Sequence, residues 1–170
     1  MIDKMIDLDE DFFASLGCKA VLLDVDNTMT THDNPVPAEG VVEWLERMKN
    51  AGIRFIVVSN NSEERVAPFA KLIEVDFVSK GAKPLPKGYR IACERLDIKP
   101  CEAVAIGDQI FTDIIGGNLL GAYTVLTVPY KYEDTLFFKF KRLMEKPFIA
   151  FYKRKAAKRN GRNIRPGGNV

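Results

Sequence analysis

Cysteine, histidine and long apolar runs are all scarce in this sequence of 170 residues. The cysteines, Cys18, Cys93 and Cys101, lack the spacing of a metal-binding motif, so we interpret them as free thiols of a reducing compartment. No apolar run approaches the roughly 18 residues that a membrane-spanning helix needs. The acidic N-terminus has no continuous apolar stretch and does not look like a secretory signal. These absences favour a cytoplasmic protein.

Basic residues are distributed unevenly along the chain. Residues 139–170 hold eleven Lys or Arg and a single acid, Glu145, whereas the rest of the chain has 14 basic and 22 acidic residues. This break predicts an acidic catalytic body over residues 1–131. A basic, aromatic-rich helix and tail over residues 132–170 would extend the same domain.

Short apolar runs rich in Val and Ile predict strands that are buried on both faces of a parallel sheet. They cover residues 20–25, 54–58, 75–78, 103–106 and 124–128. Helical patterns over residues 37–51, 62–73, 86–96 and 112–120 separate them. Alternating strands and helices indicate an α/β domain. In open parallel sheets, ligands bind beyond the carboxyl ends of the strands.

Polar residues follow four of these runs, and Asp24 is the most informative of them. Ordinary loop polarity would explain Asn61 or Gln109, but Asp24 still belongs to a buried apolar run. A buried carboxylate costs several kcal/mol unless it is paired or bound to a metal. The sequence therefore predicts that Asp24 has a charged partner or a metal.

The polar segments resemble, in order, the four motifs of the haloacid dehalogenase superfamily. They are Asp24-Val25-Asp26-Asn27-Thr28, Ser59, Lys83 and Gly107-Asp108-Gln109-Ile110-Phe111-Thr112-Asp113. More narrowly, the chain is similar to the small phosphatases of subclass IIIA, including the YqeG-type bacterial proteins, which have phosphatidylglycerophosphate phosphatases among their relatives. The resemblance implies a Rossmann-like three-layer sandwich with a five-stranded, mainly parallel sheet.

The resemblance also implies catalytic roles. Asp24 would attack phosphorus and form an aspartyl-phosphate, which suits a carboxylate because it is ionised without an activating base. Asp26 would protonate the leaving oxygen and later activate water. An Asp at this position is typical of phosphatases and phosphomutases, so a mutase stays open.

Magnesium is the cofactor that the resemblance implies. Its ligands would be the carboxylates of Asp24 and Asp108 and the backbone carbonyl of Asp26. Asp113 and Thr28 would lie behind these ligands, with Asp113 orienting a water molecule or Lys83.

The phosphoryl group would be held by residues of the middle two motifs. Ser59, Asn60 and nearby backbone N–H groups would bind its oxygens, and Lys83 would neutralise its charge. Such positioning and electrostatics supply most of what phosphoryl transfer requires.

No large cap domain is expected, because the segments between the motifs hold only one helix and one strand each. The site would then be open unless another subunit of an oligomer covers it. An open site suits a phosphorylated small molecule, a lipid head group such as phosphatidylglycerophosphate, or a phosphorylated macromolecule.

The basic tail and the single histidine have several interpretations. The tail can be a terminal helix on the core with a solvated end, or an interfacial helix at the inner surface of an anionic membrane. Nucleic-acid contact is the weakest option, since no nucleic-acid-binding fold is recognised. His32 is interpreted as a bystander in a loop rather than a substrate contact.

The prediction is a magnesium-dependent phosphatase. A receiver domain is excluded because its phospho-acceptor ends the third strand, where this chain has Lys80 and Lys83 instead. The alternative is a weak or inactive protein of the same fold that binds a membrane or nucleic acid through its tail. Because no motif residue is missing, hydrolysis of an aryl phosphate would separate the two.

Overall fold

The structure is a computed structural model that describes residues 1–31 and 33–131. His32 and the basic tail from residue 132 onward lie outside the described residues. The predictions made for them therefore stay predictions, and the fold below concerns the body of the chain.

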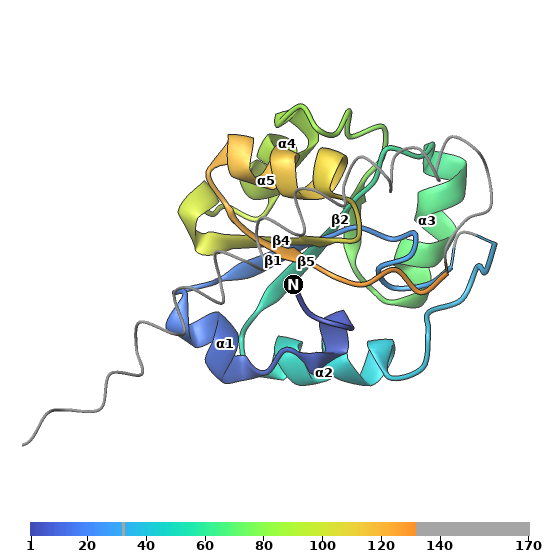
Figure 1. The fold of residues 1–170 in the computed structure, drawn as a ribbon, viewed down its shortest axis with the longest axis horizontal. Helices are drawn as coiled ribbons and strands as arrows, with labels where there is room; N and C mark the ends of the chain where they lie inside the picture. Colours follow the sequence, from blue (N-terminus) through green and yellow to red (C-terminus); the bar gives the residue numbers. More distant parts are fainter. Residues whose placement is uncertain (32, 132–170) are drawn as a thin grey trace, which may run out of the picture. The chain divides into compact units, whose positions relative to one another are not determined.

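The described residues form a five-stranded, entirely parallel sheet in the order β3-β2-β1-β4-β5 (Figure 1). The strands are β1 Ala20–Leu23, β2 Arg54–Val58, β3 Asp76–Val78, β4 Ala103–Gly107 and β5 Tyr123–Leu126. Each predicted apolar run forms one of them, so the α/β prediction is confirmed. The strand that precedes Asp24 lies in the middle of the sheet.

Helices connect the strands, and their bounds differ from the predicted ones at some ends. They are α2 Val41–Asn50, α3 Glu63–Leu72, α4 Lys87–Arg95 and α5 Ile115–Leu120. The helix predicted from residue 37 begins only at Val41, because Gly40 before it has a left-handed backbone with φ 80°. The helix predicted from residue 112 is preceded by a π-helical turn, Ile110–Ile114.

The sequence pattern missed two short N-terminal elements, the 3₁₀ turn Met5–Asp7 and the helix α1 Glu10–Ser15. One hydrogen bond within this segment and one to a distant helix hold these elements in place. The Asp9 side chain caps α1 by accepting a hydrogen bond from the N–H of Phe12 at 2.9 Å. The indole of Trp44 donates to the carbonyl of Leu8 at 2.7 Å, which ties this segment to α2.

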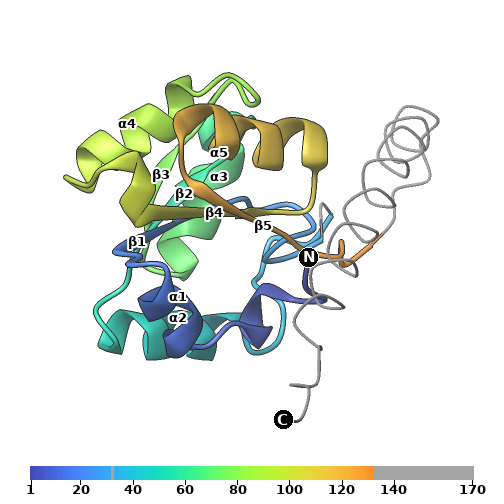
Figure 2. The same cartoon turned by 60° about the vertical axis from the view of Figure 1, so that its left-hand side comes forward.

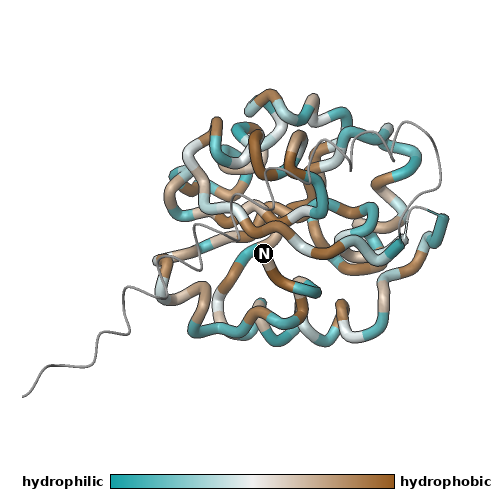
Figure 3. Tube along the Cα trace, in the orientation of Figure 1, coloured by the Kyte–Doolittle hydropathy of each residue, from teal (hydrophilic) through white to brown (hydrophobic). Residues whose placement is uncertain are grey.

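Two hydrophobic cores lie on opposite faces of the sheet, which gives three layers (Figure 2). Alternation along β1 directs Val21 and Leu23 to one core and Leu22 to the other. Helices α1, α2 and α3 contribute large side chains to the first core, while α4 contributes to the second. Figure 3 shows the hydrophobic residues concentrated in the central strands.

The connections between the strands contain no additional domain in the part of the chain that the structure describes. β1 leads through a loop and α2 into β2, and β2 leads through α3 into β3. The prediction of no large cap is confirmed for these residues. Among residues 1–31 and 33–131, no helix is long and apolar enough to cross a membrane.

Candidate active site

Polar residues gather at the carboxyl edge of the sheet, where each of the central strands ends. Asp24 follows β1, Ser59 follows β2 and Asp108 follows β4, while Lys83 lies in the loop after β3. These side chains are buried, with Asp24 9% and Lys83 7% exposed. Charged groups at this depth need partners, and the structure provides them.

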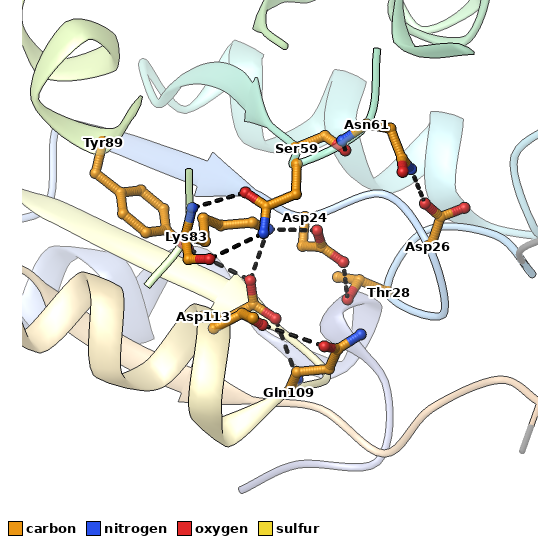
Figure 4. Close-up of polar contacts among 11 residues, drawn as sticks. Asp24, Asp26, Thr28, Ser59, Asn61, Lys83, Tyr89, Gln109 and Asp113 are labelled. Atoms are coloured by element: carbon orange, nitrogen blue, oxygen red, sulfur yellow. Dashed lines mark hydrogen bonds and ion pairs between the residues drawn. The ribbon is translucent and has the colours of Figure 1, made fainter. Parts of the chain in front are cut away.

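Lys83 is the centre of this cluster (Figure 4). Its ammonium group lies 2.5 Å from Oδ1 of Asp24 and 2.7 Å from Oδ1 of Asp113. The hydroxyl of Thr28 lies 3.5 Å from the other oxygen of Asp24. Residues that are 59 and 30 positions apart in the chain thus meet in one buried ion-pair network.

The network holds more negative than positive charge. Burial acts to lower the pKa of Lys83, but the carboxylates of Asp113 and Asp24 outweigh it, and the pKa lies well above its usual range. Burial raises the pKa of Asp24 to about 8; Lys83 opposes this shift, and the charges of Asp113 and Asp108 add to it. Lys83 therefore stays charged, and the excess of carboxylates favours an additional cation.

The carboxylates can hold that cation. Asp24, Asp108 and Asp113 each have an oxygen within 4.8 Å of the others, and all three residues are buried. Carboxylate oxygens are the ligands that Mg²⁺ prefers, and a dication offsets the charge that the lysine leaves over. The donor set and the charge balance of the site thus fit the predicted metal.

Asp113 is already engaged through both of its carboxylate oxygens. Oδ1 accepts from Lys83, and Oδ2 accepts from the backbone N–H of Gln109 at 3.1 Å. The turn can approach this closely because residue 107 is glycine: a Cβ there would lie 2.3 Å from Cγ of Asp113. The contacts of Asp113 thus hold the ammonium group of Lys83 in place.

Residues of the second motif contact the loop after β2 and the loop that carries Lys83. Ser59 is buried, and its hydroxyl accepts from the N–H of Asn61 at 3.2 Å. The Asn60 side chain, for which phosphate binding stays a prediction, holds the Lys83 backbone. Its Oδ1 accepts from the N–H of Lys83 at 2.7 Å and its Nδ2 donates to the carbonyl of Lys83 at 3.0 Å. Asn60 therefore positions the lysine loop.

The Asp26 side chain lies apart from the cluster around Lys83, on the side of Asn61 (Figure 4). Its Oδ2 accepts from Nδ2 of Asn61 at 2.5 Å and its Oδ1 accepts from Nη2 of Arg65 at 2.8 Å. The sequence analysis gave neither Asn61 nor Arg65 a role. Nothing in the spacing marks Arg65, because it lies 39 residues from Asp26.

Tyr89 of α4 is a further neighbour that the motifs did not indicate. It is 2% exposed, and its hydroxyl lies 3.4 Å from Oδ1 of Asp113. Burial and the Asp113 charge raise the pKa of Tyr89 far above its ordinary value, so the phenol stays neutral and can donate. Its ring lies beside the Lys83 side chain (Figure 4).

Comparisons with family models and with known proteins point to the same family. A model of the haloacid dehalogenase-like hydrolase family matches residues 9–121. The chain is 37% identical over 137 residues to the probable phosphatase YqeG of Bacillus subtilis (strain 168), covering 81% of this chain and 80% of that protein. It is 31% identical over 104 residues to a phosphoglycolate phosphatase of Nitrosospira multiformis, covering 56% of this chain but only 45% of that longer enzyme.

Solved structures show the same fold at low sequence identity. CbbY from Rhodobacter sphaeroides in complex with phosphate superposes with a TM-score of 0.56 at 16% identity, covering 70% of this chain and 91% of that one. A protein from Listeria monocytogenes serotype 4b superposes with a TM-score of 0.55 at 20% identity, covering 69% and 84%. These likenesses concern the fold of the body and leave the chemistry to the site residues.

Proposed function

The chain belongs to the haloacid dehalogenase-like hydrolase family and is a phosphatase of that family, and from this premise we propose that it hydrolyses a phosphate monoester through an aspartyl-phosphate on Asp24. One observation carries the proposal: Asp24 is a buried carboxylate at the carboxyl end of the central strand, 2.5 Å from the Lys83 ammonium. Burying a carboxylate costs folding free energy even when it is paired, and such groups are concentrated at functional sites.

The neighbouring residues support a division of labour. Asp24 attacks phosphorus, and Lys83 stabilises charge on the phosphoryl oxygens while Asp113 and Asn60 hold it in place. Ser59 binds a phosphoryl oxygen with the backbone N–H groups that follow β2. Asp26 gives a proton to the leaving oxygen and later takes one from water.

Magnesium is the proposed cofactor, held by the carboxylates of Asp24 and Asp108 and the backbone carbonyl of Asp26. When bound, it supplies positive charge next to the phosphoryl oxygens and keeps Asp24 ionised. Without substrate, Mg²⁺ should raise the melting temperature of the protein, because it relieves the repulsion among the buried acids. Asp108→Asn should abolish that shift, whereas Asp76→Asn at the exposed Arg95 pair should keep it.

The decisive test is Asp24→Asn with para-nitrophenyl phosphate and Mg²⁺. We expect a loss of about a thousandfold or more in kcat, because an amide is a poor nucleophile. Acid quenching of the wild-type enzyme during turnover should trap phosphate on Asp24, which mass spectrometry of peptides locates. Asp76→Asn serves as the matched control. Full activity in Asp24→Asn would contradict the mechanism.

The proposed substrate has a bulky body, such as a phosphorylated lipid head group, because no cap covers the described part of the site. We also propose a cytoplasmic protein of subclass IIIA whose basic tail contacts the inner membrane surface. Co-sedimentation with anionic vesicles tests this, by comparing the full chain with one that ends at Tyr130. Equal binding of both would remove the membrane role of the tail.

An inactive binding protein is the less favoured function. Its usual sign would be the loss of a motif residue, yet Asp24, Lys83 and Asp113 lie within contact distance of one another. A screen of phosphorylated metabolites, lipids and peptides would then identify the substrate.

A further inference from the structure

Asp26 is the only proposed acid/base of the site, and two donors fix its side chain in the structure. Nη2 of Arg65 lies 2.8 Å from Oδ1, and Nδ2 of Asn61 lies 2.5 Å from Oδ2. The Asp26 side chain is 15% exposed and that of Arg65 is 30% exposed. A carboxylate that is gripped at both oxygens has one defined orientation rather than several rotamers.

The surface pair of Arg95 and Asp76 shows what an ordinary ion pair looks like here. Its side chains are 49% and 55% exposed, and its N–O distance is 3.2 Å. Exposed pairs of this kind contribute little to stability. The pair of Arg65 and Asp26 has a shorter N–O distance and is more buried. Because Asp26 is the proposed acid/base, we expect the loss of this pair to change the reaction rate.

The two donors also connect Asp26 to the phosphate-binding strand end. Asn61 donates its backbone N–H to the hydroxyl of Ser59, and its carbonyl accepts from the N–H of Lys80 at 2.8 Å. Arg65 lies in the first turn of α3, where its N–H bonds to the carbonyl of Ser62 at 3.2 Å. These contacts connect the Asp26 side chain to the segment from β2 to α3, which also carries Ser59.

Both oxygens of Asp26 accept hydrogen bonds in this arrangement, which fixes the direction in which its carboxyl group points. We propose that Arg65 and Asn61 are positioning residues that hold Asp26 as the base for hydrolysis of the aspartyl-phosphate. This proposal rests on the phosphatase function proposed above. It concerns the second half of the reaction, in which Asp26 would take the proton of the attacking water.

The step balances with water as the only added reactant. The water oxygen forms a bond to phosphorus while the bond between phosphorus and the Asp24 oxygen breaks, and that electron pair returns to the Asp24 carboxylate. The water proton passes to Asp26. From there it is available to the leaving oxygen of the next substrate, so the cycle closes with phosphate released.

Pre-steady-state kinetics with para-nitrophenyl phosphate separates the two halves of the reaction. This substrate leaves without needing a proton, so formation of the phosphoryl-enzyme depends little on Asp26. In Arg65→Met we expect a burst near one nitrophenolate per active site, followed by a steady-state rate about 10- to 100-fold below wild type. kcat and KM should fall together, leaving kcat/KM within about twofold of wild type.

Further variants show whether the effect passes through Asp26. Asn61→Ala should give the same burst, and Arg65→Lys should recover part of the steady-state rate. In an Asp26→Asn background, Arg65→Met should change little, because residues that act through one group are not additive. Arg95→Met, which removes the surface pair, should behave as wild type, and melting curves check that each variant folds.

The possible results separate this proposal from the function itself. Equal losses in the burst and the steady state, or a rise in KM at unchanged kcat, would overturn the positioning role while leaving the phosphatase intact. An independent effect of Arg65→Met in the Asp26→Asn background would overturn it as well. A wild-type protein that turns over no phosphate ester would overturn both proposals.

Discussion

The two faces of the sheet are packed in opposite ways. The face covered by α1, α2 and α3 is filled by large side chains, among them Phe13, Trp44, Leu45, Met48 and Phe69. The face covered by α4 combines Tyr89 with small residues, including Ala92, Ala103 and Ala105. Large side chains hold helices away from a sheet, whereas small ones let backbones approach.

The loop that carries Lys83 lies on the side where the packing is small and close. Gly88 at the start of α4 lies against Gly81, and a Cβ on Gly88 would lie 2.6 Å from the Gly81 carbonyl oxygen. This contact fixes the loop that carries Lys83. The first face thus stabilises the fold by burying large apolar side chains. On the second face, small residues let the backbone segments approach closely, as the site requires.

Replacing Lys83 should have the largest effect on both activity and stability, because it removes the positive charge that pairs with Asp24 and Asp113. Lys83→Met should lower kcat about a thousandfold and cost about 3–5 kcal/mol of folding free energy, since Asp24 and Asp113 lose their partner. Steady-state kinetics and urea unfolding measure both. Lys87→Met, an exposed lysine in the same segment, should change neither. A fully active Lys83→Met would break the assignment of the site.

On the opposite face, Leu45→Ala should affect stability alone. Leu45 is 1% exposed within the large-side-chain core, so its truncation should cost about 2–5 kcal/mol. The kcat per folded molecule should stay within about twofold of wild type, because Leu45 is a core residue and is not among the residues of the site. Leu72→Ala, at a leucine that is 55% exposed, is the control. A large loss of kcat in Leu45→Ala would show that the faces are coupled.

Two substitutions in β4 contrast the faces within one strand. Gly107→Ala should cost about 1–3 kcal/mol by overpacking and reduce kcat about 10- to 100-fold, because its Cβ would displace Asp113. Ile106→Val, which points to the first core, should cost only about 0.5–1.5 kcal/mol and leave kcat unchanged. Similar losses of kcat in Gly107→Ala and Ile106→Val would contradict the proposed difference between the two faces of the sheet.

The smallest effect concerns thiol reactivity. Burial raises the pKa of Cys18 and of Cys93 to about 11, so both stay protonated thiols at pH 8. The stability that this protonation contributes is present below pH 9 and lost as the pH rises through 11. A thiol reagent at pH 8 should label the exposed Cys101 first, the half-buried Cys18 next and the buried Cys93 last. Faster labelling of Cys93 than of Cys18 would show that the close-packed face opens more readily.

Much of the fold could be predicted because it is written in local patterns. Apolar runs of four to six residues predicted every strand, since a strand buried on both faces is largely apolar. The helix ends were less accurate: α2 begins after the left-handed Gly40, and a π-helical turn, which contains Asp113, precedes α5. Neither feature has a simple local signature.

The residues of the site also fall into those that the sequence predicted and those that it did not. Asp24 could be identified from the sequence alone, because a carboxylate at the end of an apolar strand is costly and therefore informative. The sequence also placed Lys83 after the third predicted strand and Asp108 and Asp113 after the fourth, and the topology of a parallel sheet brings such residues to one edge. The residue types and their order along the chain determined this much.

Only the tertiary structure decided how these residues are held. Asn60 supports the Lys83 backbone, Tyr89 reaches Asp113, and Arg65 grips Asp26 across 39 residues of sequence. Such contacts depend on the exact placement of one helix against one loop, which no periodicity records. The physical reason is that burial is set by local pattern, whereas an ion pair is set by distances of a few ångströms between segments that meet only in the folded chain.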